Sequence, residues 1–312
     1  MLSQVIDAEH PDHLAVAFDV KGGTFRNQML PQYKGTRDAA PEELLSQLPL
    51  IQQMLTALGV TYIEKPGYEG DDVIGTLASM GDQAGYRTLV LSGDRDAFQL
   101  INDDITVLYP GHHFKDLKHM TPDAVQEKYH VSPAQYPDLA ALRGETADNI
   151  PGVPGVGDGF AAKWINQYGG LEQIIEHADE ISGKKGEALR ENIEQVKLNR
   201  SVNALVRDLD LGVSVSDLTF GQVDAGQLDD LFTKLEFGVL RLTIRRPERR
   251  NTITSDMFGA GYADVFAGDE GVGLPVMFGP AGAADAVGVG LGGVRDVEVD
   301  DVSHLGDVDA PG

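Results

Sequence analysis

The residues best suited to chemistry in this chain are carboxylates that follow predicted strands. Asp19 ends one such strand, Asp94 and Asp96 follow another, and an acidic group comes just past a third: Glu69, Asp71 and Asp72. In a parallel sheet these strand ends meet at one edge, where open α/β sheets place their sites. Carboxylates gathered there raise one another's pKa unless cations neutralise them. The pattern therefore predicts a site for Mg²⁺ or Mn²⁺, which prefer hard oxygen ligands.

Each acidic motif alone also has a purely structural explanation. Asp71 and Asp72 could favour the positive end of a helix dipole, and Gly93-Asp94 could be an ordinary turn. Their convergence on one edge, together with another acidic cluster at Glu145 and Asp148, favours the metal site. Two or more ions held in this way activate water and stabilise the leaving oxygen in phosphodiester hydrolysis.

A glycine- and proline-rich hairpin follows the last acidic cluster. Residues 148–157 read DNIPGVPGVG and lead into a predicted helix that carries Lys163. Glycines let consecutive backbone N–H groups form an anion-binding concavity at a helix N-terminus. A tight structural turn is the alternative. The candidate phosphate-binding residues are Gly152, Val153, Gly155, Val156, Gly157 and Lys163.

Cations and aromatic residues alternate in the segment between positions 21 and 37. The cations are Lys21, Arg26, Lys34 and Arg37, and the aromatic residues are Phe25 and Tyr33. Cations contact phosphates and aromatic faces stack on bases, so the segment suits a single strand or a frayed end. A solvated basic loop is the alternative interpretation.

Alternating strands and helices must position these residues. The predicted strands are 13–19, 60–63, 87–92 and 105–109, and the predicted helices are 41–58 and 71–84. This alternation predicts an α/β fold with a mostly parallel sheet and flanking helices. From about residue 121 to 240 the pattern becomes helical on both sides of the hairpin.

Composition narrows the functional class. The chain has 312 residues, no cysteine and a net charge of −24, which excludes a disulfide scaffold, a thiolate zinc site and a generally basic nucleic-acid coat. No apolar run is long enough to span a membrane and no signal peptide is evident, so we expect a cytoplasmic protein without membrane contact. Residues 251–312 contain no Lys and one Arg, Arg295, and this predicts an acidic, low-complexity tail.

Together these motifs resemble the 5′→3′ exonuclease (flap endonuclease) domain of the bacterial DNA polymerase I family, a group of PIN-like nucleases. The resemblance covers residues 2–241 and rests on residues 15–37, GYEGDDVIGTLA at 67–78, VLSGDRDAFQLI at 90–101, residues 136–157 and LEFGVLR at 235–241. It implies a PIN-like domain at 1–120 without its first strand, a helical domain with a helix-hairpin-helix (H3TH-type) motif at 121–241, and an Arg-rich junction with a disordered tail at 242–312.

The resemblance also implies roles for individual residues. The metal ligands would be Asp19, Glu69, Asp71, Asp72, Asp94, Asp96, Glu145 and Asp148, and an arch of Arg26, Tyr33, Lys34 and Arg37 would grip the scissile phosphate. The hairpin, with Lys21, Phe25 and Lys163, would bind DNA, and a K⁺ ion is expected at the hairpin. The expected partners are DNA flaps, nicks and free 5′ ends, bound by a monomer.

Departures from the family pattern leave alternatives open. The chain starts after the family's first strand, which ends in V-D-G and supplies a metal ligand, and the helix that follows it. In the hairpin the usual G-E-K-T-A reads Gly157-Asp158-Gly159-Phe160-Ala161, which loses a cation. We therefore weigh an active nuclease against a DNA-structure-binding remnant with weak catalysis, and against an RNA-directed PIN-like ribonuclease.

Overall fold

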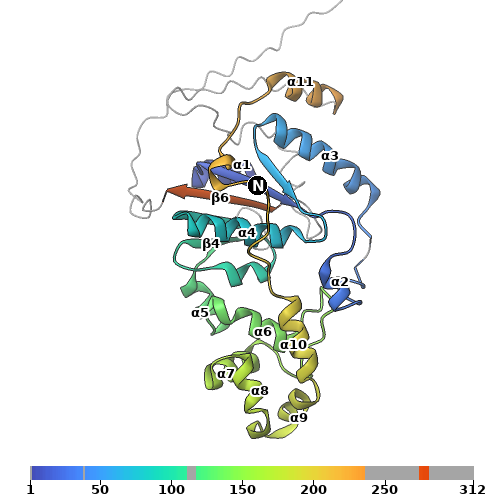
Figure 1. The fold of residues 1–312 in the computed structure, drawn as a ribbon, viewed down its shortest axis with the longest axis vertical. Coiled ribbons are helices and arrows are strands. Elements are labelled where there is room, and N and C mark those ends of the chain that lie inside the picture. Colours follow the sequence, from blue (N-terminus) through green and yellow to red (C-terminus); the bar gives the residue numbers. More distant parts are fainter. Residues whose placement is uncertain (1, 38, 111–116, 236–273, 281–312) are drawn as a thin grey trace, which may run out of the picture. The chain divides into compact units, whose positions relative to one another are not determined.

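The computed structural model describes residues 2–37, 39–110, 117–235 and 274–280, the last of these through its backbone (Figure 1). The strands are β1 (His13–Phe18), β2 (Thr61–Glu64), β3 (Tyr86–Leu91), β4 (Ile105–Pro110), β5 (Leu117–Met120) and β6 (Leu274–Pro280). The helices of the sheet region are α1 (Leu2–Glu9), α2 (Phe25–Met29), α3 (Glu42–Ala57), α4 (Gly70–Gln83), the 3₁₀ helix η1 (Arg95–Leu100) and α11 (Ala225–Lys234). Those of the helical region are α5 (Pro122–Tyr129), α6 (Tyr136–Arg143), α7 (Asp158–Tyr168), α8 (Leu171–Glu176), α9 (Gly183–Glu191) and α10 (Ile193–Val202).

In the described part of the chain the strands form one mixed sheet in the order β2-β1-β6-β3-β4-β5. β1 runs parallel to β2, with Ala15 opposite Thr61, and β3 runs parallel to β4, with Thr88 opposite Ile105. The four strands expected from sequence are confirmed to within about two residues at each end. Because β1, β2 and β3 run in one direction, the residues that follow them lie at one edge of the sheet.

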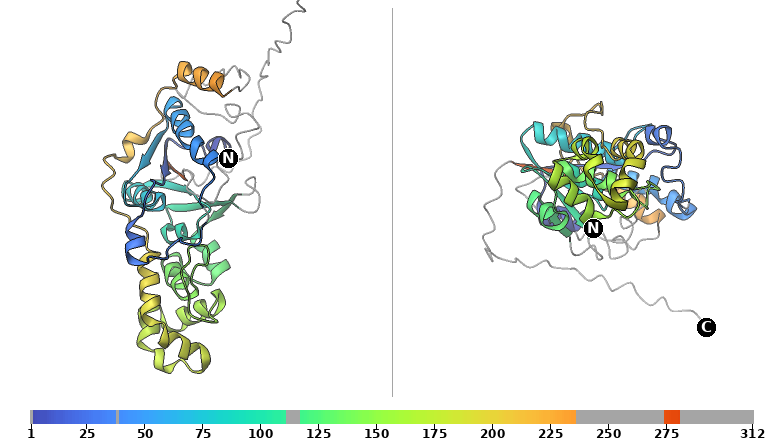
Figure 2. Two further views of the ribbon diagram at one scale, coloured as in Figure 1. Left: turned by 90° about the vertical axis from the view of Figure 1, so that its right-hand side faces the viewer. Right: turned by 90° about the horizontal axis from the view of Figure 1, so that it is seen from below.

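Helices cover both faces of this sheet (Figures 1 and 2). On one face α1, α3 and α11 pack apolar side chains against β1 and β3, including Ile6, Leu55 and Leu228. On the other face α4 buries Ile74 and Leu77. Burial on both faces explains why the strands read as continuous apolar runs. Helix α1 was not anticipated from the sequence.

The strand β6 occupies the centre of the sheet, between β1 and β3, and runs antiparallel to both. Val276 lies opposite Ala15 on one side and Val90 on the other. An empty position there would leave backbone N–H and C=O groups of two buried strands unpaired, which is costly. These seven residues, which belong to the segment expected to be a disordered tail, therefore form a paired strand. The rest of 242–312 lies outside the described residues.

The helical region shares its core with the sheet region. One buried cluster runs from Ile74 and Phe98 through Tyr136 and Leu139 to Trp164. Phe98 makes edge-to-face contacts with Tyr109 and Tyr136, which joins η1 to β4 and α6. Residues 1–281 accordingly cluster as one unit, and the domain limits at 120 and 241 stay predictions. Among the described residues, no helix is both long and apolar enough to cross a membrane.

Candidate active site

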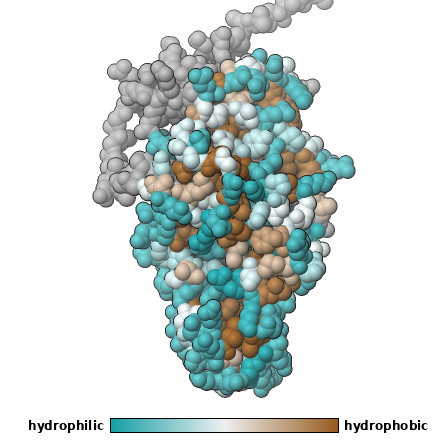
Figure 3. Space-filling view, in the orientation of Figure 1, coloured by the Kyte–Doolittle hydropathy of each residue, from teal (hydrophilic) through white to brown (hydrophobic). Residues whose placement is uncertain are grey.

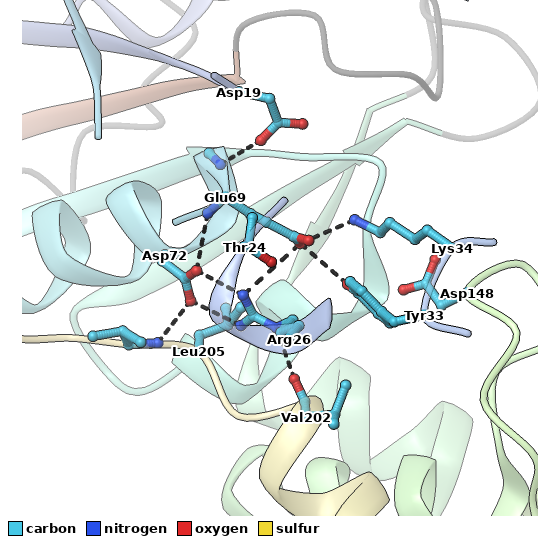
Figure 4. Close-up of polar contacts among 12 residues, drawn as sticks. Asp19, Thr24, Arg26, Tyr33, Lys34, Glu69, Asp72, Asp148, Val202 and Leu205 are labelled. Atoms are coloured by element: carbon cyan, nitrogen blue, oxygen red, sulfur yellow. Dashed lines mark hydrogen bonds and ion pairs between the residues drawn. The ribbon is translucent and has the colours of Figure 1, made fainter. Parts of the chain in front are cut away.

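Acidic residues gather at the predicted sheet edge, where Figure 4 shows Asp19 and Glu69. Asp71, Asp94 and Asp96 lie close enough there to affect one another's pKa. Asp19 directly follows β1, and its Oδ1 accepts a hydrogen bond from the backbone N–H of Gly70 at 2.5 Å. This bond ties the end of β1 to the first turn of α4, which carries Asp71. Asp94 is the N-cap of η1, and its side chain accepts from the N–H of Asp96 at 2.8 Å. Local capping therefore aims these carboxylates at one place.

Burial and mutual repulsion together raise the pKa of three half-buried carboxyls at this edge. Burial and the neighbouring Asp94 raise the pKa of Asp71 well above its usual range, and Asp19 and Glu69 add to the effect. Burial raises the pKa of Asp96 well above its usual range, as do Asp94 and Glu145. The pKa of Asp94 is raised by burial and by Asp148. A cation placed among them would relieve this repulsion.

Glu69 lies beneath the segment that carries the arch residues, 26–37, which we call the arch segment, and it is 8% exposed. Its Oε2 accepts hydrogen bonds from the Tyr33 hydroxyl at 3.1 Å and from Lys34 Nζ at 2.9 Å. Burial and Glu69 raise the pKa of Tyr33 far above its usual range, so this hydroxyl stays a donor. Lys34 has a φ of 54°, which is costly for a side chain with a Cβ. The backbone is strained at the position that brings this cation over the acidic edge.

The arch segment is also joined to the last acidic cluster. Arg37 Nη2 donates to Asp148 Oδ1 at 2.5 Å, and the backbone N–H of Lys34 donates to the Asp148 carbonyl at 2.9 Å. Asn149 adds a bond from its side-chain amide to the Gln32 carbonyl at 2.9 Å. Asp148 thus joins the site through the arch. Glu145 pairs with Arg143, which also binds Asp158, so this carboxylate is held toward the hairpin.

Two predicted residues are placed differently from the expectation. Arg26, expected to grip a phosphate, is 2% exposed and donates two hydrogen bonds to Asp72. Asp72, expected to be a metal ligand, is fully buried, and its two oxygens also accept backbone N–H groups. Neither group is free to contact a ligand in this geometry, because buried charges need all their partners inside the fold. Lys21 is exposed, whereas the ring of Phe25 packs against Tyr68.

The hairpin divides into buried and exposed positions. Val153 and Val156 are buried, and their N–H groups donate to the carbonyls of Leu142 and Val153, so these amides do not face a ligand. Gly152 is half-buried against the chain at Arg143. The exposed positions are Gly155, with a φ of 76°, Gly157, which is the N-cap of α7, and Lys163 on α7.

A further basic residue lies beside the hairpin and was missed from the sequence. Lys185 of α9 places its Nζ 3.9 Å from the centre of the Phe160 ring, and its Cε lies close to Gly155. Phe160 is 44% exposed in a region whose visible face is mostly hydrophilic (Figure 3). Lys185 is distant from the hairpin in sequence, so no local sequence pattern indicates that the two are in contact. Lys185 returns a positive charge to the place where the hairpin sequence lacks one.

The donor set at the sheet edge suits a hard divalent cation, since it consists of carboxylate oxygens. The arrangement is not a preformed cage, because no group of three His, Asp or Glu side chains in the described ranges is close enough to hold one ion. Glu69 and Asp148 are instead paired with Lys34 and Arg37. The carboxylate side chains would therefore have to move to bring ligands together.

Two protein-family models match this chain. The 5′-3′ exonuclease N-terminal resolvase-like domain matches residues 1–130, and the 5′-3′ exonuclease C-terminal SAM fold matches residues 131–226. The DNA polymerases I of Mycobacterium bovis and Mycobacterium tuberculosis are each 47% identical over 241 residues, which is 77% of this chain and 27% of the relative. The chain therefore spans about a quarter of the length of these curated relatives.

Solved structures show the same fold at lower identity. The bacteriophage T5 5′-exonuclease with divalent metal ions (zinc) bound is 21% identical, with a TM-score of 0.57 over 76% of this chain and 88% of that chain. The bacteriophage T5 flap endonuclease in a complex with DNA and metal ions is 20% identical, with a TM-score of 0.56 over 75% and 87%. These similarities confirm the expected fold class, a PIN-like α/β domain followed by a helical domain.

Proposed function

We propose that this chain, which belongs to the 5′-3′ exonuclease family, hydrolyses phosphodiester bonds in DNA that carries 5′ flaps, nicks or free 5′ ends, in replication or repair. One observation carries the proposal. Half-buried carboxylates from separate strand ends meet at a single edge, where burial and their mutual repulsion raise their pKa. Two cations of the arch, Lys34 and Arg37, pair with Glu69 and Asp148 beside them. An acidic edge faced by cations suits a phosphate held between metal ions and basic side chains.

Divalent ions fit the chemistry of this edge. Asp71, Asp94 and Asp96 are the residues that would hold them, with Asp19, Glu69, Glu145 and Asp148 close by. Bound there, Mg²⁺ or Mn²⁺ would supply an activated water and charge stabilisation for the leaving oxygen. The metal-bound T5 structures support a divalent ion in this fold. The number of ions and a K⁺ ion at the hairpin remain predictions.

The chain's own residues would bind and orient the DNA. Lys34 and Arg37 can each leave a carboxylate partner for a phosphate oxygen, because Arg37 is exposed and Lys34 is partly exposed. Tyr33 keeps its proton and positions Glu69. The exposed amides at Gly155 and Gly157, with Lys163, would contact duplex phosphates without reading bases. Contacts of this kind select DNA structure and not sequence.

A specific observation favours a second candidate, a DNA-structure-binding protein with weak catalysis. The central strand β6 has the sequence LPVMFGP and contains no acidic residue. Its start lies at the site edge, because Leu274 pairs with Ala17 near the end of β1. The strand between β1 and β3 therefore brings no carboxylate to the metal site. Fewer ligands would lower metal affinity and rate while leaving the DNA-binding surfaces intact.

The test compares cleavage and binding of a labelled 5′-flap DNA by the full chain. In Mg²⁺ we expect cleavage that Asp71→Asn abolishes and that Asp229→Asn, an exposed acid on α11, leaves unchanged. In Ca²⁺ both variants should bind the flap within a few-fold of the parent. Binding without cleavage would establish the second candidate, faster cutting of an RNA flap would establish a ribonuclease, and equal cleavage by Asp71→Asn would refute the proposed site.

A further inference from the structure

A buried ion pair lies behind the acidic edge (Figure 4). Arg26, in the first turn of α2, and Asp72, in the first turn of α4, are 2% and 0% exposed. Arg26 Nη1 donates to Asp72 Oδ2 at 2.6 Å, and Nη2 donates to Oδ1 at 2.8 Å. These two parallel bonds form the bidentate geometry that only a guanidinium provides.

The Asp72 carboxylate is saturated with hydrogen bonds. Besides Arg26, its Oδ1 accepts the backbone N–H of Val206 at 3.0 Å, and its Oδ2 accepts the backbone N–H of Glu69 at 3.1 Å. Each oxygen therefore accepts two bonds, which is the ordinary capacity of a carboxylate oxygen. A metal ion would have to displace a buried donor to reach either oxygen, and that donor would be left unpaired.

The pair joins three segments that are far apart in sequence. Besides α2 and α4, it holds the stretch from the last residue of α10 onward, which we call the return segment and define as Val202–Val206. Arg26 Nε donates to the carbonyl of Val202 at 2.8 Å, and Nη2 donates to that of Ala204 at 3.0 Å. Gln99 of η1 holds the same segment through Asn203 and Leu205. The return segment is where the chain leaves the helical region for the sheet.

Glu69 makes this pair relevant to the site. The backbone N–H of Glu69 donates a hydrogen bond to Asp72. The Glu69 carboxylate accepts hydrogen bonds from Tyr33 and Lys34 at the acidic edge. Arg26 Nη1 also lies 3.9 Å from Glu69 Oε2. The helical region, the arch and the first turn of α4 therefore meet at one guanidinium.

We propose that Arg26 and Asp72 are positioning residues that lock the return segment against the acidic edge, and that Asp72 holds no metal ion. The inference deepens the proposed function, since it divides the adjacent acids into one that faces the ions, Asp71, and one that aligns the DNA-binding helices with them. A buried pair is poor evidence for stability alone, because hydrophobic replacements often serve as well. Its bonds to four backbone groups are what make it a connector.

The test compares Asp72→Asn with Asp71→Asn in the full chain, using Mn²⁺ titration calorimetry and hydrogen exchange. Asp72→Asn should keep the parent's number of bound Mn²⁺ ions, whereas Asp71→Asn should weaken Mn²⁺ binding by about tenfold or more. The amides of Val206 and Glu69 should exchange about tenfold faster in Asp72→Asn and at the parental rate in Asp71→Asn. On flap DNA, Asp72→Asn should lower kcat with no rescue by excess Mg²⁺.

Arg26→Lys provides a second variant if Asp72→Asn folds poorly. It keeps the charge but loses the fork that reaches Val202 and Ala204, so it should reproduce the faster exchange with unchanged Mn²⁺ binding. Loss of a bound Mn²⁺ ion in Asp72→Asn, or unchanged exchange at Val206, would overturn the inference. If the parent binds no Mn²⁺ and cuts no DNA, the proposed function fails, and the exchange experiment still decides whether the pair holds the return segment.

Discussion

The glycines of the hairpin provide a graded test of what the tertiary structure requires. A Cβ on Gly152 would lie 1.9 Å from the carbonyl oxygen of Arg143, where real Cβ atoms essentially never come within 3.0 Å. The two backbone segments would have to separate by about 1 Å, which breaks the bond from the Val153 amide to the Leu142 carbonyl. Overpacking of about 1–3 kcal/mol and an unpaired buried amide of about 1–3 kcal/mol predict a loss of about 2–6 kcal/mol for Gly152→Ala.

Two neighbouring glycines serve as matched controls. Gly155 has space for a Cβ but has a φ of 76°, so Gly155→Ala should cost about 1–2 kcal/mol. Gly159 lies inside α7 with nothing within 4 Å of a Cβ, so Gly159→Ala should stabilise by about 0.5–1 kcal/mol. The three substitutions add the same methyl group, and the expected order follows from space and backbone angle alone.

Urea unfolding followed by tryptophan fluorescence measures these differences directly. Trp164 is the chain's only tryptophan, lies on α7 next to the hairpin and is 5% exposed. Its emission should shift to longer wavelength at a lower urea concentration in Gly152→Ala, with the slope of the transition unchanged. A Gly152→Ala protein within about 1 kcal/mol of the parent, or no more affected than Gly155→Ala, would show that the close approach to Arg143 does not exist.

Three further outcomes are expected. Burial and Asp148 raise the pKa of Asp94, so the ionised carboxylate destabilises the fold as pH rises above the unfolded pKa of about 3.9. In differential scanning fluorimetry without metal, Asp94→Asn should therefore melt at a higher temperature than the parent at pH 7 and at the same temperature at pH 3. Its melting temperature should rise less than that of the parent when Mg²⁺ is added. Deleting residues 274–312 should lower the melting temperature, whereas deleting 281–312 should not, because only the first removes β6; equal melting curves would contradict the central strand. Lys185→Ala should weaken duplex binding and reduce by about one the slope of log binding constant against log salt concentration, while Lys118→Ala on β5 should change neither. An unchanged slope in Lys185→Ala would place Lys185 away from the phosphates.

Local sequence determined where the helices and strands form and which kind of chemistry the carboxylates suit. The apolar runs at 13–19 and 87–92 form β1 and β3, and the periodic leucines at 41–58 form α3. A strand buried on both faces gives a continuous apolar run, and a helix with one buried stripe gives a helical spacing of apolar residues, so both patterns can be recognised from the sequence alone. Asp19 and Asp94 came to one edge because consecutive parallel strands must end there.

Tertiary structure decided which charges face outward and what fills the sheet. Asp71 and Asp72 are adjacent in sequence and alike in type, yet a helix turns successive side chains by about 100°, so one faces the acidic edge and the other meets Arg26. Besides the local bond from the Glu69 amide, Asp72 is bound by residues 26 and 206, and no local pattern links these two to it. No local pattern predicts the pairing of β6 with β1 and β3, or the contact of Lys185 with Phe160. Contacts between residues so far apart in sequence depend on which backbone groups and charges still lack a partner after the rest of the chain has packed.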